Sequence, residues 1–256
     1  MEKKDTAPQS LVRALHLFEI LAKRSAMSVA EISREFGVTR TTTYSLLGPL
    51  VDLNYIEKDE ETGKYRLGYR FYELGKRYRH YFPFMPQADA YAKTLSARVG
   101  QQVNVAVYRH PGKALFVCNA NMSGQNFVQP ESVVSAAVSA CGKVLLAALD
   151  EETLDEALRS MTYFQYTSSS ITDSELLRAE IKKAHDRGYA EENGELFSLR
   201  GCIAMPICGF GGRVVAAMSI YGDIEAMRAN HSDYLAALRD TVTQLSRELG
   251  WTGYGI

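Results

Sequence analysis

The sequence contains no long uninterrupted run of apolar residues, although 46% of its residues are hydrophobic. A helix that spans a bilayer needs about 18 or more consecutive apolar residues. The nearest approach, residues 133–149, is interrupted at four places: Ser135, Ser139, Gly142 and Lys143. We therefore expect no membrane-spanning helix, and the polar opening MEKKDTAPQS predicts no signal peptide.

Cysteine is scarce as well, and the four that occur show no C-x-x-C spacing: Cys118, Cys141, Cys202 and Cys208. Disulfide frameworks and zinc sites both need cysteines in close, regular groupings. The pattern therefore favours a protein of the reducing cytoplasm. We expect neither a metal ion nor a cofactor.

A strong charge of one sign is also missing, because the net charge is only −1. Residues 1–80 hold 14 Lys and Arg against 11 Asp and Glu, a balance of +3, which leaves 15 against 19, or −4, for the remainder. The 256 residues leave room for one small and one medium domain. This distribution suits a DNA-binding amino-terminal domain followed by a weakly acidic one.

Residues 28–53 have the pattern of two short helices joined by a tight turn. Ser28 and Glu31 form an S-x-x-E capping box, so a helix is expected to begin directly after Ser28. Gly37 can adopt the left-handed conformation that ends this helix, and the Thr39 hydroxyl can cap a second one. This order is typical of a helix-turn-helix, whose second helix enters the DNA major groove.

The second helix has two different faces. Spacings of three and four residues predict a stripe toward the core: Thr43, Leu46, Leu50 and Leu53. The opposite face carries groups that can reach base edges and phosphates: Arg40, Thr41, Tyr44 and Ser45. Pro49 cannot donate a hydrogen bond to the Ser45 carbonyl, which predicts a kink in the second half. The alternative is a small polar helix that only supports a larger fold.

Residues 55–58 and 64–67 can pair as a two-stranded wing with its tip near Thr62-Gly63. Lys64 and Arg66 on the returning strand are placed to contact a phosphate backbone. Ahead of this winged helix-turn-helix we expect a helix capped by Ser10, with one apolar face: Leu11, Leu15, Phe18 and Ala22.

A basic, aromatic segment at 69–81 predicts a linker helix that ends before Pro83 and Pro86. It can pack against another domain or subunit, or contact nucleic acid, and the sequence leaves both open. We predict a winged helix-turn-helix domain over 1–68, the linker over 69–86 and a second domain over 87–256.

In the second domain, helices mix with antiparallel strands, so we predict an α+β fold. Helices are expected at 88–99, 141–149, 151–160, 173–187 and 232–249. Hairpins are expected at 103–108 with 114–119, and at 202–207 with 214–221, while 121–129 reads as irregular.

The last hairpin gathers polar groups on one face of the sheet. Strand alternation puts Cys202 on one face of its strand, and Ser219 and Tyr221 on one face of the partner strand. A two-residue Gly211-Gly212 turn places Cys202 opposite Tyr221, whereas a wider loop places it opposite Ser219. The face is either a ligand pocket or a half-buried surface whose polar groups are satisfied locally. The helix start at 139–143 is a possible second wall, because helix N-termini favour anions.

Seven strings, in order along the chain, resemble the IclR family of bacterial transcriptional regulators: LVRALHLFEILA, SVAEISREFGVTRTTTYSLL, ETGKYRLG, GKVLLA, RGYA, CIAMP and VVAAMSIYG. The resemblance covers essentially the full length. It implies a winged helix-turn-helix, a linker helix and a GAF-like α+β domain that binds a small organic acid and drives dimers or tetramers.

The resemblance also assigns residues. The family's DNA-reading positions fall on Arg40, Thr41, Thr42, Tyr44 and Ser45, and its effector-contacting positions on Cys141, Gly142, Glu192, Cys202, Ser219 and Tyr221. Glu192 occupies a position where the family usually has Asp, and Tyr221 one where a small hydroxyl residue is common. The pocket is therefore expected to differ in shape from that of its relatives. Thr43, Tyr44 and Ser45 depart from the family's usual apolar-His-Arg run, so the operator sequence does not carry over.

These observations predict a cytoplasmic, homo-oligomeric transcription factor that binds a near-palindromic operator as a dimer or dimer of dimers and senses a small organic acid. The alternative is a cysteine-dependent enzyme on a GAF-like domain, with Cys202 as nucleophile. No histidine stands in a recognisable relation to Cys202 or Cys141, and an apolar strand favours an inert thiol. We therefore expect no enzyme.

Overall fold

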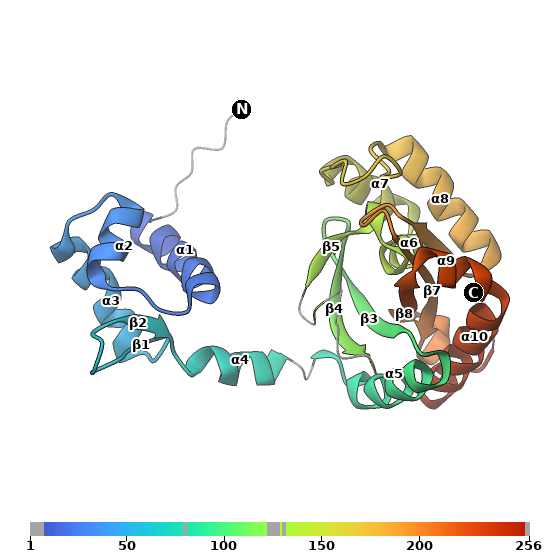
Figure 1. Ribbon diagram of the computed structural model, residues 1–256, viewed down its shortest axis with the longest axis horizontal. Helices are drawn as coiled ribbons and strands as arrows, with labels where there is room; N and C mark the ends of the chain where they lie inside the picture. Colours follow the sequence, from blue (N-terminus) through green and yellow to red (C-terminus); the bar gives the residue numbers. More distant parts are fainter. Residues whose placement is uncertain (1–7, 79–80, 122–128, 130–131, 254–256) are drawn as a thin grey trace. The chain divides into compact units, whose positions relative to one another are not determined.

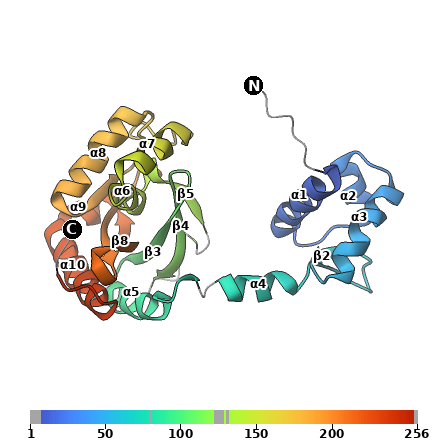
Figure 2. The same ribbon diagram turned by 180° about the vertical axis from the view of Figure 1, so that it is seen from behind.

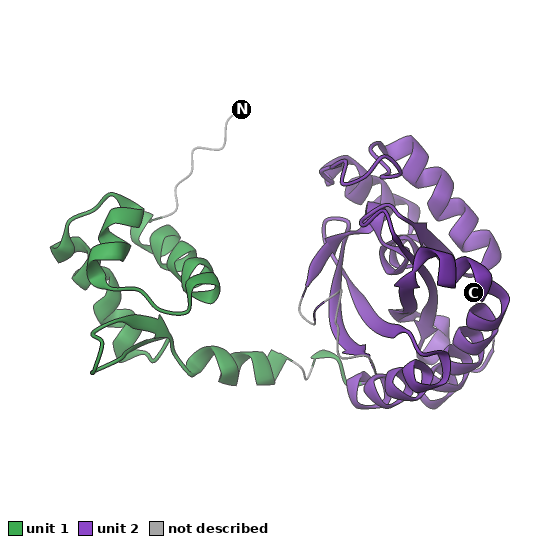
Figure 3. Cartoon of the chain, viewed as in Figure 1, with its two compact units in different colours: residues 1–83 green, residues 84–256 purple. Residues whose placement is uncertain are grey.

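The computed structural model describes residues 8–78, 81–121, 129 and 132–253. The chain divides into two compact units, residues 1–83 and 84–256 (Figure 3). Most of the predicted irregular segment 121–129 lies outside the described residues. Among the described residues, no helix is long and apolar enough to cross a bilayer.

The first unit is a helical domain with a small two-stranded sheet (Figure 1). Its elements are α1 (Gln9–Arg24), α2 (Val29–Phe36), α3 (Arg40–Asp52), β1 (Ile56–Lys58), β2 (Tyr65–Leu67) and α4 (Arg70–Tyr78). The capping box of Ser28 and Glu31 is present, Gly37 has a φ of 61°, and the Thr39 hydroxyl accepts from the Thr42 N–H. The local signals for the helix-turn-helix are therefore confirmed.

The prediction for α1 is wrong in two respects. The helix begins at Gln9 after Pro8, and Ser10 does not cap it. Its buried residues are Ala14, Leu17 and Leu21, whereas Leu11 and Leu15 are about half exposed. The apolar residues form one stripe wider than a single buried face, and the predicted and the buried residues lie on adjoining parts of it. Packing against α2, α3 and the wing decides which face is buried.

Within α3 the predicted core stripe is partly wrong. Thr43 is fully buried, and Leu46 and Leu50 pack against the core. Leu47 is buried at 1% exposure, whereas Leu53 follows the end of the helix and is 60% exposed. The helix is continuous through Pro49. In the wing, Ile56 pairs with Leu67 and Lys58 with Tyr65, and Asn54 adopts a φ of 61° where the chain leaves α3.

The second unit is an antiparallel sheet between two layers of helices (Figures 1 and 2). Its strands, in the order β5-β4-β3-β8-β7-β6, are β3 (Gln102–Arg109), β4 (Lys113–Ala120), β5 (Val133–Ser135), β6 (Ala190–Asn193), β7 (Arg200–Cys208) and β8 (Val214–Asp223). The helices are α5 (Met85–Val99), α6 (Ala140–Ala147), α7 (Glu151–Ser160), α8 (Ser174–Arg187), α9 (Ile224–Ala229) and α10 (His231–Glu248). The predicted α+β class is confirmed, while β5, β6 and α9 were not predicted.

The two helical layers differ in what they cover. On one side, α5 contacts β3 and β4, and α10 contacts β7 and β8. On the other side, α6 crosses the sheet and α7 and α8 pack outside it. Between α6 and the sheet lies a core rich in small residues, including Ala140, Cys141, Ala204 and Ala217. Small side chains there let α6 approach the sheet closely, which brings its first turn near the polar face predicted from the last hairpin.

Candidate functional site

The exposed face of α3 carries the residues predicted to read DNA. All five are exposed: Arg40, Thr41, Thr42, Tyr44 and Ser45. The Thr42 hydroxyl lies 3.0 Å from the Thr39 hydroxyl, and the Ser45 hydroxyl donates to the Thr41 carbonyl at 3.1 Å. These two hydroxyls are thus engaged within the helix, whereas Arg40 makes no ion pair among the described residues. The face offers a guanidinium, hydroxyls and a phenol to solvent.

The wing presents two cations on one strand. Lys64 and Arg66 are exposed, and the Arg66 Nη2 lies 3.2 Å from Oε2 of Glu57 on β1. An exposed ion pair of this kind is worth about 1 kcal/mol or less, so a phosphate can replace the carboxylate at small cost. Asp59 is engaged within the tip of the wing, because its carboxylate accepts from the Thr62 N–H and hydroxyl.

In the second unit, one transverse row of the sheet carries the predicted polar groups. Tyr221 on β8 pairs with Cys202 on β7, and Cys202 pairs with Glu192 on β6. Ser219 lies on the same face, opposite Asn104 of β3. The register that places Cys202 opposite Tyr221 is therefore the observed one. The two-residue turn, one of the two alternatives, is nevertheless not formed, because a 3₁₀ turn over 210–212 and a register shift after Ile207 close the hairpin.

These residues enclose a small inner cavity between the sheet and the start of α6. It is lined by Asn104, Phe116, Val134, Val138, Ser139, Ala140, Glu192, Leu196, Cys202, Ser219 and Tyr221. The space is about 20 Å³, room for roughly one water molecule. The Ser219 hydroxyl is fully buried there and, by geometric criteria, has no hydrogen-bond partner among the described residues. An organic acid is larger than this space, so its binding requires the cavity to expand.

Glu192 is the carboxyl group of this cavity. It is 2% exposed, and one of its oxygens accepts from the backbone N–H groups of Leu196, at 3.1 Å, and Glu195. Burial raises the pKa of Glu192 to about 7, against the opposing effect of these two hydrogen bonds. The carboxyl group is therefore divided between its neutral and charged forms near neutral pH.

A buried ion pair lies directly behind Glu192. The Lys143 ammonium of α6 lies 2.6 Å from Oε1 of Glu195 and donates to the Glu191 carbonyl at 2.9 Å. Lys143 is 1% exposed. The second Glu195 oxygen has no hydrogen-bond partner among the described residues. The pair ties α6 to the segment that follows β6, and so fixes the wall that carries Glu192.

Cys141 and Gly142 lie beside the inner cavity but do not line it. The Cys141 thiol is fully buried and donates to the Ala217 carbonyl at 3.9 Å. A side chain at Gly142 would meet the Ala136 Cα at 2.3 Å, and its N–H donates to the Ser139 hydroxyl at 3.3 Å. Ser139 and Ala140 take the lining positions from this helix start. Gly142 thus permits close packing of α6.

The buried thiols are not activated nucleophiles. Burial raises the pKa of Cys141 to about 12 and the pKa of Cys202 well above its usual value, and the weaker influence of Ser219 lowers both. A thiol needs its thiolate form to attack a substrate. Neither group is a thiolate at neutral pH. Among the described residues no cluster of three His, Cys, Asp or Glu could hold a metal ion.

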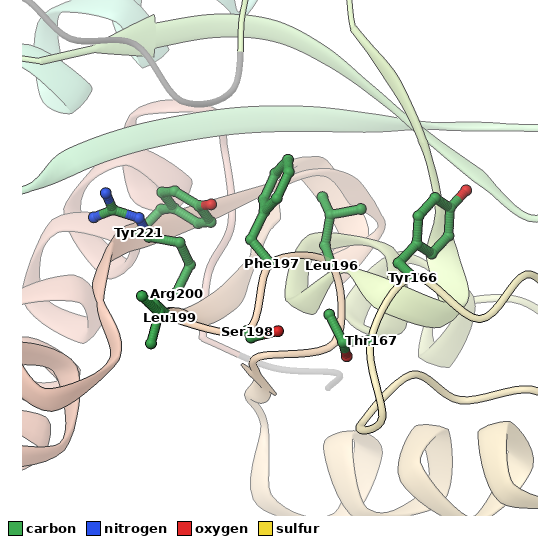
Figure 4. A pocket seen from close by; sticks show the side chains of 8 residues that line it. All are labelled: Tyr166, Thr167, Leu196, Phe197, Ser198, Leu199, Arg200 and Tyr221. Atoms are coloured by element: carbon green, nitrogen blue, oxygen red, sulfur yellow. The ribbon is translucent and has the colours of Figure 1, made fainter.

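A larger outer cavity of about 430 Å³ adjoins the inner one. Tyr221 and Leu196 line both, so they form the wall between them. Arg200 lies with Tyr221 at one end of the outer cavity, and Tyr166 lies at the other (Figure 4). The outer cavity is therefore aromatic and carries a cation, whereas the inner cavity carries a carboxyl group.

The sequence matches the family description "IclR helix-turn-helix domain" over residues 10–60 and "Bacterial transcriptional regulator IclR C-terminal" over residues 78–247. The second match alone covers more than half of the chain. The chain belongs to the IclR family of bacterial transcriptional regulators. As an IclR-type regulator it binds DNA through the helix-turn-helix and is not an enzyme, which agrees with its neutral, buried thiols.

Individual relatives match this IclR-family chain over nearly its whole length. It is 24% identical to the transcriptional regulator KdgR of Escherichia coli, over 99% of this chain and 97% of that protein. It is 27% identical to the Escherichia coli transcriptional repressor AllR, over 94% and 90% respectively. A solved IclR homologue from Microbacterium hydrocarbonoxydans, complexed with 4-hydroxybenzoate, superposes with a TM-score of 0.79 at 24% identity, over 94% and 97% of the two chains.

Several residues of the inner cavity escaped the sequence analysis. Asn104 lines the cavity, and the buried Gln102 on the same face of β3 supports it, because the Gln102 side chain donates to Asn104 at 2.7 Å. Their alternation in a strand of otherwise apolar residues was a signal that could have been used. Phe116, Val134 and Leu196 had no such signal, because apolar residues that line a cavity look like core residues in the sequence.

Proposed function

We propose that this IclR-family protein is a cytoplasmic, ligand-responsive regulator that binds a near-palindromic operator as a homodimer or a dimer of dimers. In this proposal Arg40, Thr41, Thr42, Tyr44 and Ser45 contact bases and nearby phosphates, and Lys64 and Arg66 contact flanking phosphates. The observation that carries it is the exposed, hydroxyl-rich face of α3, on which Arg40 has no ion-pair partner within the described part of the chain. Two copies read two half-sites, as paired recognition helices do.

The effector is proposed to be a small organic acid, held at the inner cavity. The proposed contacts are Cys141, Gly142, Glu192, Cys202, Ser219 and Tyr221. Four of these line the cavity, and Cys141 and Gly142 act through the packing of the α6 start. A solved homologue carries 4-hydroxybenzoate, an organic acid, which supports this class of ligand.

A signal from the cavity must alter the DNA-binding unit, and α4 is the proposed element for this. Its exposed aromatic residues include Tyr72 and Tyr78, and Tyr69 directly before the helix is exposed as well. Phe71 packs edge-on against Phe18 and Tyr55. Packing of this face against a second copy would couple the spacing of two DNA-binding units to the effector. Such coupling exists only if the effector binds the DNA-competent and incompetent states with different affinity.

Binding to DNA is tested with a duplex from upstream of the protein's own gene and a scrambled duplex of equal length. Arg40→Ala is expected to weaken specific binding by about 1–3 kcal/mol, the value of a good base contact. Lys23→Ala removes one exposed positive charge from α1 and serves as the matched control. Equal affinity of wild type and Arg40→Ala, or no preference for the native duplex, would contradict the proposal.

A further inference from the structure

The inner cavity is unusual for an anion site because it holds a carboxyl group and no cation. Among the described residues that line it, none is Lys, Arg or His. Lys143 is the nearest buried cation, but its ammonium is occupied by the Glu195 carboxylate and the Glu191 carbonyl. Arg200 lines only the outer cavity. A ligand carboxylate in the inner cavity therefore meets Glu192 without a positive charge to separate them.

Two ionised carboxylates cannot share a buried site of this size, because like charges at contact distance raise the pKa of one of them strongly. The stable arrangement is one carboxylic acid that donates a hydrogen bond to one carboxylate, and the two groups then titrate as a pair. Such charge-assisted O–H···O bonds are short and strong. The remaining polar groups, the Ser219 hydroxyl and the Asn104 amide, can donate to the outer oxygens of the pair.

We propose that the inner cavity binds a carboxylate ligand together with one proton, as a carboxylic acid–carboxylate pair formed between the ligand and Glu192. The proposal rests on the function proposed for this cavity and specifies its chemistry. The proton comes from water, and no bond other than O–H is made or broken. The inner cavity thereby takes one carboxylate per ligand, since a second ionised group held in the same cavity would again lack a cation.

The surroundings of Glu192 agree with a group that accepts a proton. The Glu195 carboxylate raises the pKa of Glu192, because it disfavours a second negative charge nearby. The Lys143 ammonium on α6 acts in the opposite direction and lowers the pKa of Glu192. From the neighbouring strands, Cys202 and Tyr221 face Glu192 in their neutral forms, and burial raises the pKa of both. From α8, Glu180 faces Glu195. The pKa of about 7 for Glu192 places the proton uptake within an accessible pH range.

The test measures proton uptake by calorimetry of the full-length protein, in two buffers with different ionisation enthalpies. The probes are acetate, benzoate and 4-hydroxybenzoate. With a pKa of about 7, wild type is expected to take up about 0.9 proton per ligand at about pH 8 and about 0.1 at about pH 6. Its affinity is expected to fall about tenfold per pH unit above pH 7.

Glu192→Gln is the decisive variant, because its amide can donate to the ligand without a proton from water. Its uptake is expected to be near zero, with affinity independent of pH and about tenfold above wild type at about pH 8. Arg200→Gln is the matched control from the outer cavity and is expected to keep the wild-type uptake. Thermal unfolding confirms that each variant is folded.

The outcomes separate the inference from the function on which it rests. Binding to wild type without proton uptake at about pH 8 overturns the inference and leaves organic-acid sensing intact. Loss of binding in Arg200→Gln, with wild-type pH dependence in Glu192→Gln, also overturns it, because the ligand then sits in the outer cavity. If none of the three acids binds wild type at about pH 6, the proposed organic-acid function and the inference both fail.

Discussion

The hydroxyl of Ser33 on α2 lies 2.8 Å from the hydroxyl of Thr43 on α3, and both side chains are buried. Thr43 also donates to the Thr39 carbonyl, at 3.2 Å. This polar contact joins the two helices of the helix-turn-helix at their crossing point. It explains why a threonine occupies a core position of α3, where periodicity alone suggested an ordinary apolar stripe.

Thr43→Val is expected to destabilise the DNA-binding unit by about 1–2 kcal/mol. Valine has nearly the same shape, but it leaves the buried Ser33 hydroxyl without its partner on α3. The measurement is amide hydrogen exchange over residues 28–53, which should accelerate. Thr41→Val makes the same chemical change on the exposed face and should leave the exchange rates unchanged. If the amides of residues 28–53 exchange at the same rate in Thr43→Val and Thr41→Val, the hydroxyl contact contributes nothing to the packing of α2 on α3.

Lys143→Met is expected to destabilise the second unit by about 3–5 kcal/mol, because it leaves the buried Glu195 carboxylate without its cation. The double variant Lys143→Met/Glu195→Gln removes both charges and should recover much of this loss. The single tryptophan, Trp251, belongs to the unit 84–256, so its fluorescence follows the denaturant unfolding of that unit. A double variant less stable than Lys143→Met would argue against an uncompensated charge as the cause.

The raised pKa of Glu192 predicts how stability depends on pH. Between its usual value of 4.5 and about 7, the folded chain holds this proton and the unfolded chain releases it. Stability therefore falls as the pH rises through this window, by about 3 kcal/mol in total for this group. Below the window the group contributes no penalty, and above it the penalty is complete.

Glu192→Gln removes this ionisation while its carbonyl oxygen can still accept from Leu196 and Glu195. The free energy of unfolding of the variant is expected to exceed that of wild type by a margin that grows from about pH 5 to about pH 8. Trp251 fluorescence in denaturant at each pH provides the measurement. Two parallel pH curves would show that Glu192 has the same pKa in the folded and unfolded chain.

Tyr221→Ser is expected to change the size of acid that the protein binds, because Tyr221 forms part of the wall between the two cavities. Removing the ring joins the spaces, so 4-hydroxybenzoate should gain thermal stabilisation relative to acetate. Tyr166→Ser changes the same residue type at a position that lines the outer cavity and not the inner one. It should leave the stabilisation by 4-hydroxybenzoate relative to acetate unchanged. An unchanged ligand profile in Tyr221→Ser would remove this side chain from the site.

Sequence alone determined the local features. The capping box at Ser28, the left-handed turn at Gly37 and the cap at Thr39 depend on neighbours within four residues, so their effect can be read directly. Strand alternation likewise placed Cys202, Ser219 and Tyr221 on one face, because the side-chain period of a strand is two regardless of its surroundings.

Only the tertiary structure decided the rest. The apolar stripe of α1 is wider than the face that is buried, so the elements that pack on it decided which part became buried. Leu53 became exposed because α3 ends before it. The inner cavity depends on β6, on Asn104 and on the Lys143–Glu195 pair, which are brought together from segments far apart in the chain. Burial, and with it the shifted pKa of Glu192, is a property of that assembly and of no single segment.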